Sequence, residues 1–249
     1  AGGEILVQTT GALTIGGDLN AGSGNVTFGE ATSMTGGGMI FADTLTGLNA
    51  TSNTFIINGA GGVGTLNTVA IDITNIVGGV NADTITINGG VLPGTINAGD
   101  GNDNITLQNG GQLTSNVING EAGQDDLTID FSGGTNVAPF DGLTFNGGDP
   151  TANPGDSLFL TNSGLFTSAS FNFTNPSDGS ITLTGTSTGT INYTGLEPVF
   201  ALIGTQNINF EFNGGNETIT VDDNGTSNDG LSSIDSDQGE QVVFQNPNQ

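Results

Sequence analysis

Short stretches in which apolar and polar residues alternate recur along the whole chain. Clear examples are Ala12 to Ile15 (ALTI), Thr84 to Ile87 (TITI), Asn104 to Leu107 (NITL) and Ile181 to Leu183 (ITL). A period of two places successive side chains on opposite faces of a strand, which is typical of half-buried β-structure. No stretch combines a 3.6-residue apolar period with good helix formers and capping residues. The pattern therefore predicts an all-β protein made of short strands and turns.

Three aspartates indicate that the strands repeat. Asp83, Asp103 and Asp125 each stand two residues before an apolar residue, and they lie 20 and 22 positions apart. A fixed period near 20 residues is typical of a solenoid, in which each turn of chain stacks on the previous one. Glycine fills 44 of the 249 positions, and it supplies the positive backbone angle φ that tight corners between strands need. We therefore expect a parallel β-solenoid with alternate side chains filling a narrow interior.

The chain changes character from about Phe140 onward. Ten of the 14 phenylalanines and the only tyrosine, Tyr193, lie between there and the C-terminus. Residues 168–174, 180–185 and 190–194 are separated by the sequences NPSDG and TSTG, which favour tight reversals. This pattern predicts an antiparallel meander.

Two parts of the chain follow from these patterns. We expect a parallel β-solenoid over residues 1–160, with its most regular turns at residues 78–128. Residues 161–249 are expected to form a β-rich C-terminal extension, and the alternative is a continuation of the solenoid with larger turns.

Charge restricts the function further. The chain has no lysine, arginine or histidine and no cysteine, whereas 25 aspartates and glutamates give it a formal charge of −25. Nucleic-acid binding lacks its cationic contacts, and nucleophilic catalysis with a histidine base or a thiolate is excluded. Anionic membrane surfaces would repel the chain, and no run of 18 apolar residues exists to span a bilayer. We therefore expect no nucleic-acid partner, no membrane insertion and neutralisation by cations from outside.

The first 60 residues contain short strands such as ALTI and NVTF between turns rich in glycine, asparagine and serine. They resemble the repeats of filamentous-haemagglutinin-type adhesins. Residues 191–199 (INYTGLEPV) resemble a segment of giant repeat-containing surface proteins of aquatic bacteria. The first resemblance implies a right-handed parallel β-helix that is secreted, associated with the cell surface and used as a long adhesive or structural rod.

Residues 98–106 (AGDGNDNIT) resemble the calcium-binding nonapeptide of RTX proteins, Gly-Gly-x-Gly-x-Asp-x-U-x, in which U is a large apolar residue. Gly99, Gly101, Asp103 and Ile105 fit this motif, and Ala98 departs from it. The resemblance implies that the glycine turn exposes backbone carbonyl groups and that the aspartate adds a carboxylate. Two stacked turns would complete one calcium site.

Two neighbouring copies of the motif are incomplete. Residues 78–86 (GGVNADTIT) keep Asp83, and residues 120–128 (GEAGQDDLT) keep Asp125 but carry Glu121 in place of the second glycine. Calcium is expected between Asp83 and Asp103 and between Asp103 and Asp125. The alternative is that tight corners use glycine, asparagine and aspartate for their geometry, with carboxylates that are solvated or bonded to their own turn. The predicted metal ligands are Asp83, Gly99, Gly101, Asp103 and Asp125.

These observations predict an extracellular structural or adhesive rod, rigidified by calcium and assembling head to tail with other copies into a filament, surface layer or matrix. Cell-surface or matrix polysaccharide is a second expected partner. A monomeric calcium-binding segment of a large cell-surface adhesin is the first alternative. The second is a polysaccharide-degrading enzyme that uses carboxylates alone. We expect no catalytic residues, because neighbours such as Asp125 and Asp126 face opposite sides of a strand.

Overall fold

The computed structural model describes residues 3–48, 53–57, 62–132, 141–149, 155–162, 166–186, 188–213, 215–237 and 239–247. The strands of the first part are β1 (Ile5–Val7), β2 (Ala12–Ile15), β3 (Leu19–Asn20), β4 (Asn25–Phe28), β5 (Ser33–Gly36), β6 (Met39–Thr46), β7 (Thr54–Ile57), β8 (Val63–Leu66), β9 (Val69–Gly79), β10 (Thr84–Asn88), β11 (Val91–Leu92), β12 (Ile96–Asp100), β13 (Asn104–Gln108), β14 (Gln112–Leu113), β15 (Val117–Ala122), β16 (Asp126–Asp130), β17 (Leu143–Asp149) and β18 (Asp156–Thr161). They are followed by β19 (Phe166–Asn175), β20 (Asp178–Gly185), β21 (Thr188–Thr194), β22 (Leu196–Leu202), β23 (Asn207–Phe212), β24 (Ile219–Asp223), β25 (Leu231–Ser236) and β26 (Gly239–Gln245). The expected all-β class is confirmed.

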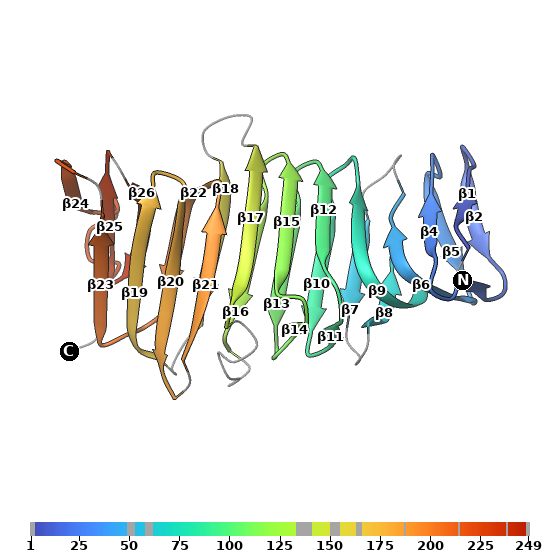
Figure 1. The fold of residues 1–249 in the computed structure, drawn as a ribbon, viewed down its shortest axis with the longest axis horizontal. Helices are drawn as coiled ribbons and strands as arrows, with labels where there is room; N and C mark the ends of the chain where they lie inside the picture. Colours follow the sequence, from blue (N-terminus) through green and yellow to red (C-terminus); the bar gives the residue numbers. More distant parts are fainter. Residues whose placement is uncertain are drawn as a thin grey trace.

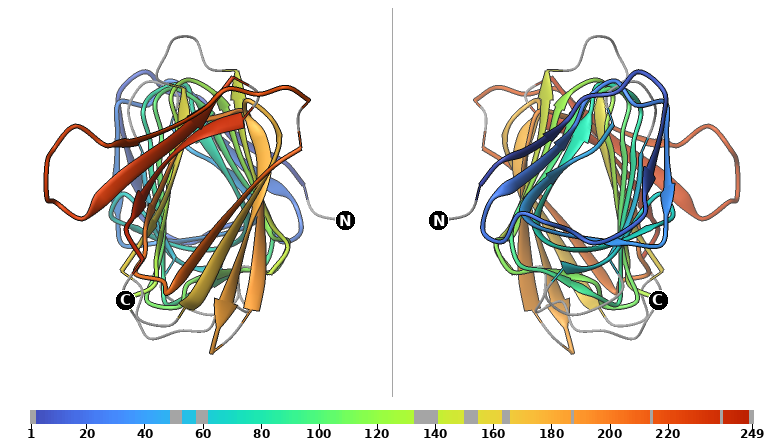
Figure 2. Two further views of the ribbon diagram at one scale, coloured as in Figure 1. Left: turned by 90° about the vertical axis from the view of Figure 1, so that its left-hand side faces the viewer. Right: turned by 90° about the vertical axis from the view of Figure 1, so that its right-hand side faces the viewer.

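Successive turns of the chain, here called rungs, stack on one another through parallel strand pairs. One column of pairs runs through β1, β4, β6, β9, β12, β15, β17 and β21. A second column runs through β7, β10, β13, β16, β18, β22 and β26. Figure 1 shows these strands side by side along the length of the molecule, and Figure 2 shows the stack from its two ends.

The interior of the stack is filled by the apolar residues of the alternating patterns. In the first column, Ile76, Ile96, Ile118, Phe145 and Tyr193 occupy equivalent positions and are all buried. Because the register is kept from rung to rung, each of these side chains packs against its counterpart in the next rung. The sequence alternation therefore reports correctly which face of each strand points inward.

The predicted antiparallel meander is confirmed. Strand β20 pairs antiparallel with β19 on one side and with β21 on the other. The parallel columns nevertheless continue past this meander, because β21 returns to β17 and β22 returns to β18. The division expected between residues 160 and 161 falls at the last residue of β18, and these two parallel pairings cross it.

A second antiparallel hairpin lies in the part for which we expected parallel strands only. Strand β8 pairs antiparallel with β7 and with β9. A two-residue turn at Asn67 and Thr68 reverses the chain, and Asn67 has the positive φ of 53° that such turns require. This hairpin lengthens its rung and interrupts the 20-residue period.

The two ends of the stack leave part of the interior uncovered. Seven apolar side chains pack against the core but are only partly buried among the described residues, and all lie in the first or last strands: Ile5, Val7, Leu13, Leu19, Ile208, Phe210 and Phe212. Their strands each have a single partner among the described strands, since β1 pairs with β4, β2 with β5, β3 with β6 and β23 with β19. No helix among the described residues is long and apolar enough to cross a bilayer.

Candidate functional site

Five polar residues lie above one another at an interior corner of the stack. The residues that follow them pair in register from strand β7 to strand β18, so the five positions are equivalent. None is more than 2% exposed. We call this set the aspartate column: Asn53, Asp83, Asp103, Asp125 and Asp156. The structure thus brings together the three aspartates that we predicted as metal ligands.

Hydrogen bonds connect each member of the aspartate column to the next. The backbone N–H of each residue donates to the Oδ1 atom of its counterpart one rung further along the chain. The donor–acceptor distances are 2.6 Å from Asn53 to Asp83, 2.7 Å from Asp83 to Asp103, 2.8 Å from Asp103 to Asp125 and 2.8 Å from Asp125 to Asp156. Because each acceptor belongs to a carboxyl group, these bonds are stronger than neutral amide bonds when the group is ionised. The carboxyl groups therefore join neighbouring rungs.

Glycines provide the space in which the carboxyl groups lie. Asp83, Asp125 and Asp156 each lie against a glycine five to nine residues earlier in the same rung: Gly78, Gly120 and Gly147. A Cβ atom added to Gly120 would collide with Oδ2 of Asp125 and with the carbonyl oxygen of Gly147. A Cβ atom added to Gly147 would collide with Oδ2 of Asp156 in the same way. Ala98 holds the equivalent position in the rung of Asp103, where the motif departs from the nonapeptide pattern.

The predicted ligands Gly99 and Gly101 form the neighbouring corner. Their φ angles of 106° and 127° lie in the region that favours glycine. A Cβ atom on Gly99 would collide with the carbonyl oxygen of Gly79, so the rungs approach closely there. The N–H of Gly101 donates to the carbonyl oxygen of Ala122 at 2.7 Å. Close stacking of the rungs therefore accounts for both glycines without a cation, although Glu121 holds the position equivalent to Gly99 in the next rung.

Burial makes the charged form of these carboxyl groups costly. It raises the pKa of Asp103 to about 7 and that of Asp125 to about 7, although the backbone bond that each accepts lowers the pKa and neighbouring carboxylates raise it further. Burial also raises the pKa of Asp83 and of Asp156. The Oδ2 atoms of Asp103, Asp125 and Asp156 are buried without a hydrogen-bond partner. Each of these carboxyl groups must therefore either stay protonated or be neutralised by a cation. The chain contains no basic side chain that could act as that cation.

Asn53 and Asp156 belong to the column but were not predicted. Both follow the same local pattern as the other three, with an apolar residue two positions later, Phe55 and Leu158. Asn53 lies 30 positions before Asp83, and Asp156 lies 31 positions after Asp125, so a search for a period near 20 misses both. Asn53 ends the column with a neutral amide, which accepts from the N–H of Leu48 at 2.8 Å and donates to its carbonyl oxygen at 3.0 Å. In the next rung, the residue in register with Asp156 is the apolar Leu196.

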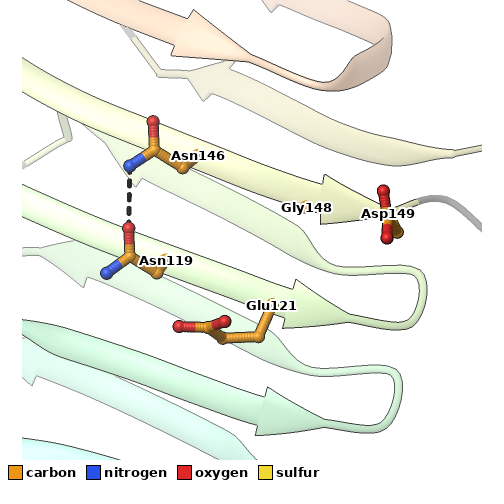
Figure 3. Close-up of a pocket in the computed structure, with 5 residues that line it drawn as sticks. All are labelled: Asn119, Glu121, Asn146, Gly148 and Asp149. Carbon is orange, nitrogen blue, oxygen red and sulfur yellow. Dashed lines mark hydrogen bonds between the residues drawn. The ribbon is translucent and has the colours of Figure 1, made fainter.

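A shallow polar pocket lies on the outer surface of the same region. It is lined by Asn119, Glu121, Asn146, Gly148 and Asp149, as Figure 3 shows. The Asn146 amide donates to Oδ1 of Asn119 at 2.7 Å, and Glu121 has a φ of 81° although its neighbours in register are glycines. Sequence reasoning treated Glu121 only as a departure from the motif. The pocket offers carboxylate and amide oxygens, which are ligands that calcium accepts.

Asp125 and Asp126 do point to different surroundings. Asp125 is fully buried in the column, whereas Asp126 is half-buried and lines an outer cleft with Asn104 and Ser157.

Among the described residues, no group of three or more acidic side chains is arranged to hold a metal ion. No protein-family model and no curated protein sequence matches the chain.

The raised pKa values predict that the protein loses stability as the pH rises. The unfolded pKa of an aspartate is 3.8, so near pH 5.5 the carboxyl groups of Asp103 and Asp125 together bind about two more protons in the folded protein than in the unfolded chain. The stabilisation is fully present below pH 3.8 and is lost as the pH rises through about 7. Denaturant unfolding at a series of pH values, in high salt to screen surface repulsion and with a chelator present, measures this dependence.

Replacing Asp125 by asparagine tests the origin of that dependence. Asparagine keeps an Oδ1 acceptor and cannot ionise. Asn53 shows that a neutral amide fits in the same column. Asp125→Asn should therefore be more stable than the wild type at pH 8 and should reduce the proton difference by about one. The exposed Asp222→Asn is the control and should change neither. An unchanged pH dependence in Asp125→Asn would refute the assignment.

Filling the space beside the column should destabilise the stack. The Gly120→Ala side chain would collide with a carboxyl group and with the next rung, so we expect the free energy of unfolding to fall by about 2 kcal/mol. Gly17→Ala is the control, because a Cβ atom there meets nothing within 4 Å. Chemical denaturation of both variants checks this, and equal stability of the two would contradict the packing described for Gly120.

Proposed function

We propose that this chain is a right-handed parallel β-solenoid that serves as an extracellular structural or adhesive rod and joins other copies head to tail. The observation that carries the proposal is that apolar side chains at both ends of the stack are only partly covered by the described residues. Parallel pairing continues from β1 to β21, so a further copy in the same orientation would extend the same columns. A stack of this kind gives a stiff element whose length grows by addition of rungs.

The apolar residues at the two ends favour another copy as the partner. Ile5 and Val7 face inward at one end, and Phe210 and Phe212 face inward at the other. Contact between these ends would bury both sets and would pair the free edges of β1 and β23. Each end of the stack thus has partly exposed apolar side chains and an unpaired strand edge, and the opposite end of another copy could cover both.

Cations are required by this proposal because every copy has a formal charge of −25. Approach of two copies is opposed by this charge unless salt or bound cations reduce it. Calcium is the proposed cation, with Asp83, Asp103, Asp125 and the corner glycines Gly99 and Gly101 as its ligands. Calcium takes six or more oxygens and is abundant outside cells, which is why we propose an extracellular or cell-surface location.

The second candidate function is a monomeric calcium-binding segment of a large cell-surface adhesin. The buried Oδ2 atoms without hydrogen-bond partners on Asp103 and Asp125 favour it, because a cation would satisfy them. Binding of cell-surface or matrix polysaccharide is compatible with either function. We propose no catalytic activity, and no contact among the described residues favours the carboxylate-dependent cleavage of polysaccharide.

Head-to-tail assembly can be tested with a pair of substitutions on one strand. The side chain of Val7 faces the interior of the first rung, and that of Leu6 on the same strand is 55% exposed on the outside. We expect the wild type to form elongated oligomers in high salt or calcium, and Val7→Asp to weaken association about tenfold or more. Sedimentation velocity and electron microscopy measure this.

Leu6→Asp is the matched control, since it adds the same charge to the same strand without entering the end surface. It should assemble nearly as well as the wild type. A wild type that stays monomeric in every salt and calcium condition would refute the head-to-tail proposal, as would equal loss of assembly in both variants.

Calcium binding predicts a stabilisation that depends on the aspartate column. At a calcium concentration one hundred times the dissociation constant, the free energy of unfolding should rise by about 2.7 kcal/mol for one site. Asp103→Asn should abolish this rise, whereas Asp18→Asn, an exposed change in an early rung, should preserve it. Thermal unfolding with calcium or with chelator gives the comparison. Identical unfolding of the wild type in both solutions would remove calcium from the proposal.

A further inference from the structure

Strand β24 is an edge strand at the C-terminal end of the large sheet and is exposed along its whole length. It pairs antiparallel with β25, and β25 pairs with β26. No pairing to the other edge of β24 occurs among the described strands, so the backbone N–H and C=O groups of that edge face solvent. Figure 2 shows this terminal part of the chain extending beyond the outline of the other rungs. Such an edge is available for a further strand.

One face of β24 carries two exposed apolar side chains. Ile219 and Val221 are 47% and 62% exposed and lie close together along the strand. Because side chains alternate along a strand, both lie on the same face, which also carries Asp223 at the end of the strand. Val221 stands opposite Ile234 of β25, which is buried. This face therefore continues the apolar surface of the sheet outward, with no residue of the described chain upon it.

The opposite face of β24 is acidic. Thr220 and Asp222 point to this side, and Thr220 stands opposite Asp235 of β25. The two carboxylates lie on one face, in adjacent strands, without any basic residue in the chain to neutralise them. The edge strand thus has two different faces, one with Ile219 and Val221 followed by Asp223 and one with Thr220 and Asp222.

Charge decides which kind of strand fits this edge. Two copies that paired through β24 would bring the same carboxylates together, and like charges in neighbouring strands oppose pairing. Acidic residues on an exposed edge in fact protect a protein against pairing with itself. A strand that alternates apolar and basic side chains meets both faces correctly, with apolar groups beside Val221 and cations beside Asp222.

We propose that β24 is a docking edge for an extended peptide segment of another protein in which apolar and basic residues alternate. The segment adds to the sheet as a further strand beside β24. Main-chain hydrogen bonds hold it, Ile219 and Val221 contact its apolar side chains, and Asp222 and Asp235 pair with its cations. The edge of β24 lies at the same end of the stack as β23, but binding of the segment requires only the strand β24 and not the head-to-tail contact.

Synthetic peptides test the proposal on the intact chain. A fluorescent peptide of alternating valine and lysine, about seven residues long to match a strand, should bind and should weaken as salt rises. A peptide of alternating glycine and lysine has the same charge but poor strand propensity and no apolar face. We expect it to bind at least about tenfold more weakly. Hydrogen exchange should show that the valine–lysine peptide protects the amides of β24.

Two pairs of variants separate the contributions of the two faces. Combined Ile219→Thr and Val221→Thr substitutions should weaken the valine–lysine peptide at least about tenfold. Combined Asp222→Asn and Asp235→Asn substitutions should weaken it and reduce its salt dependence. Leu6→Thr and Asp18→Asn are the controls, because they make the same kinds of change on exposed residues of the first rungs. Both controls should bind as the wild type does.

Several results would overturn the proposal. Equal binding of the glycine–lysine peptide would indicate attraction to the polyanionic surface alone. Equal effects of the control and β24 variants would place the peptide elsewhere on the molecule. Association of the protein with itself that is lost in the Ile219→Thr and Val221→Thr variant would identify a second copy as the occupant of the edge.

Discussion

Hydrogen bonds from backbone amides to buried aspartate oxygens are the interaction on which the central stack depends. They connect five consecutive members of one column, from Asn53 to Asp156, and each crosses from one rung to the next. The strands on both sides of the corner are held in register by the same contacts. The interaction has a cost, because each carboxyl group is taken out of water in a chain without basic residues. Protons or cations must offset that cost, and this need links the fold to its surroundings.

The partly covered apolar ends and the net charge have opposite effects on the association of copies. Apolar residues such as Val7 and Phe210 favour addition of further rungs, whereas the net charge of −25 favours separation of the copies. A rod with these properties responds to the ionic composition around it, because the apolar contact is short-ranged and the repulsion is screened by salt. The same charge makes β24 a poor surface for self-association and a suitable one for a basic partner.

Much of the fold was predictable because local alternation reports which side chains point inward. The pattern around Ile85 and Ile105 identified buried strands, and the reversals around residues 175 and 186 identified the antiparallel meander. The hairpin at β8 was not predicted, because its short strand resembles the parallel strands on either side. The aspartates were recognised as equivalent, but their main contact was not, since a sequence pattern does not show that a side chain bonds to the backbone of another rung. Asn53 and Asp156 were missed because longer rungs hide the repeat.

Hydrogen exchange at single residues tests the central interaction most directly. The backbone amides of Asp83, Asp103 and Asp125 lie at corners, where amides ordinarily exchange quickly because they have no partner in a strand. The account predicts that these three amides exchange only through global unfolding, as slowly as the amides of Ile105 and Leu127 in the buried strands. Exchange at the rate of exposed turn amides would contradict it, because the carboxyl groups would then not join the rungs.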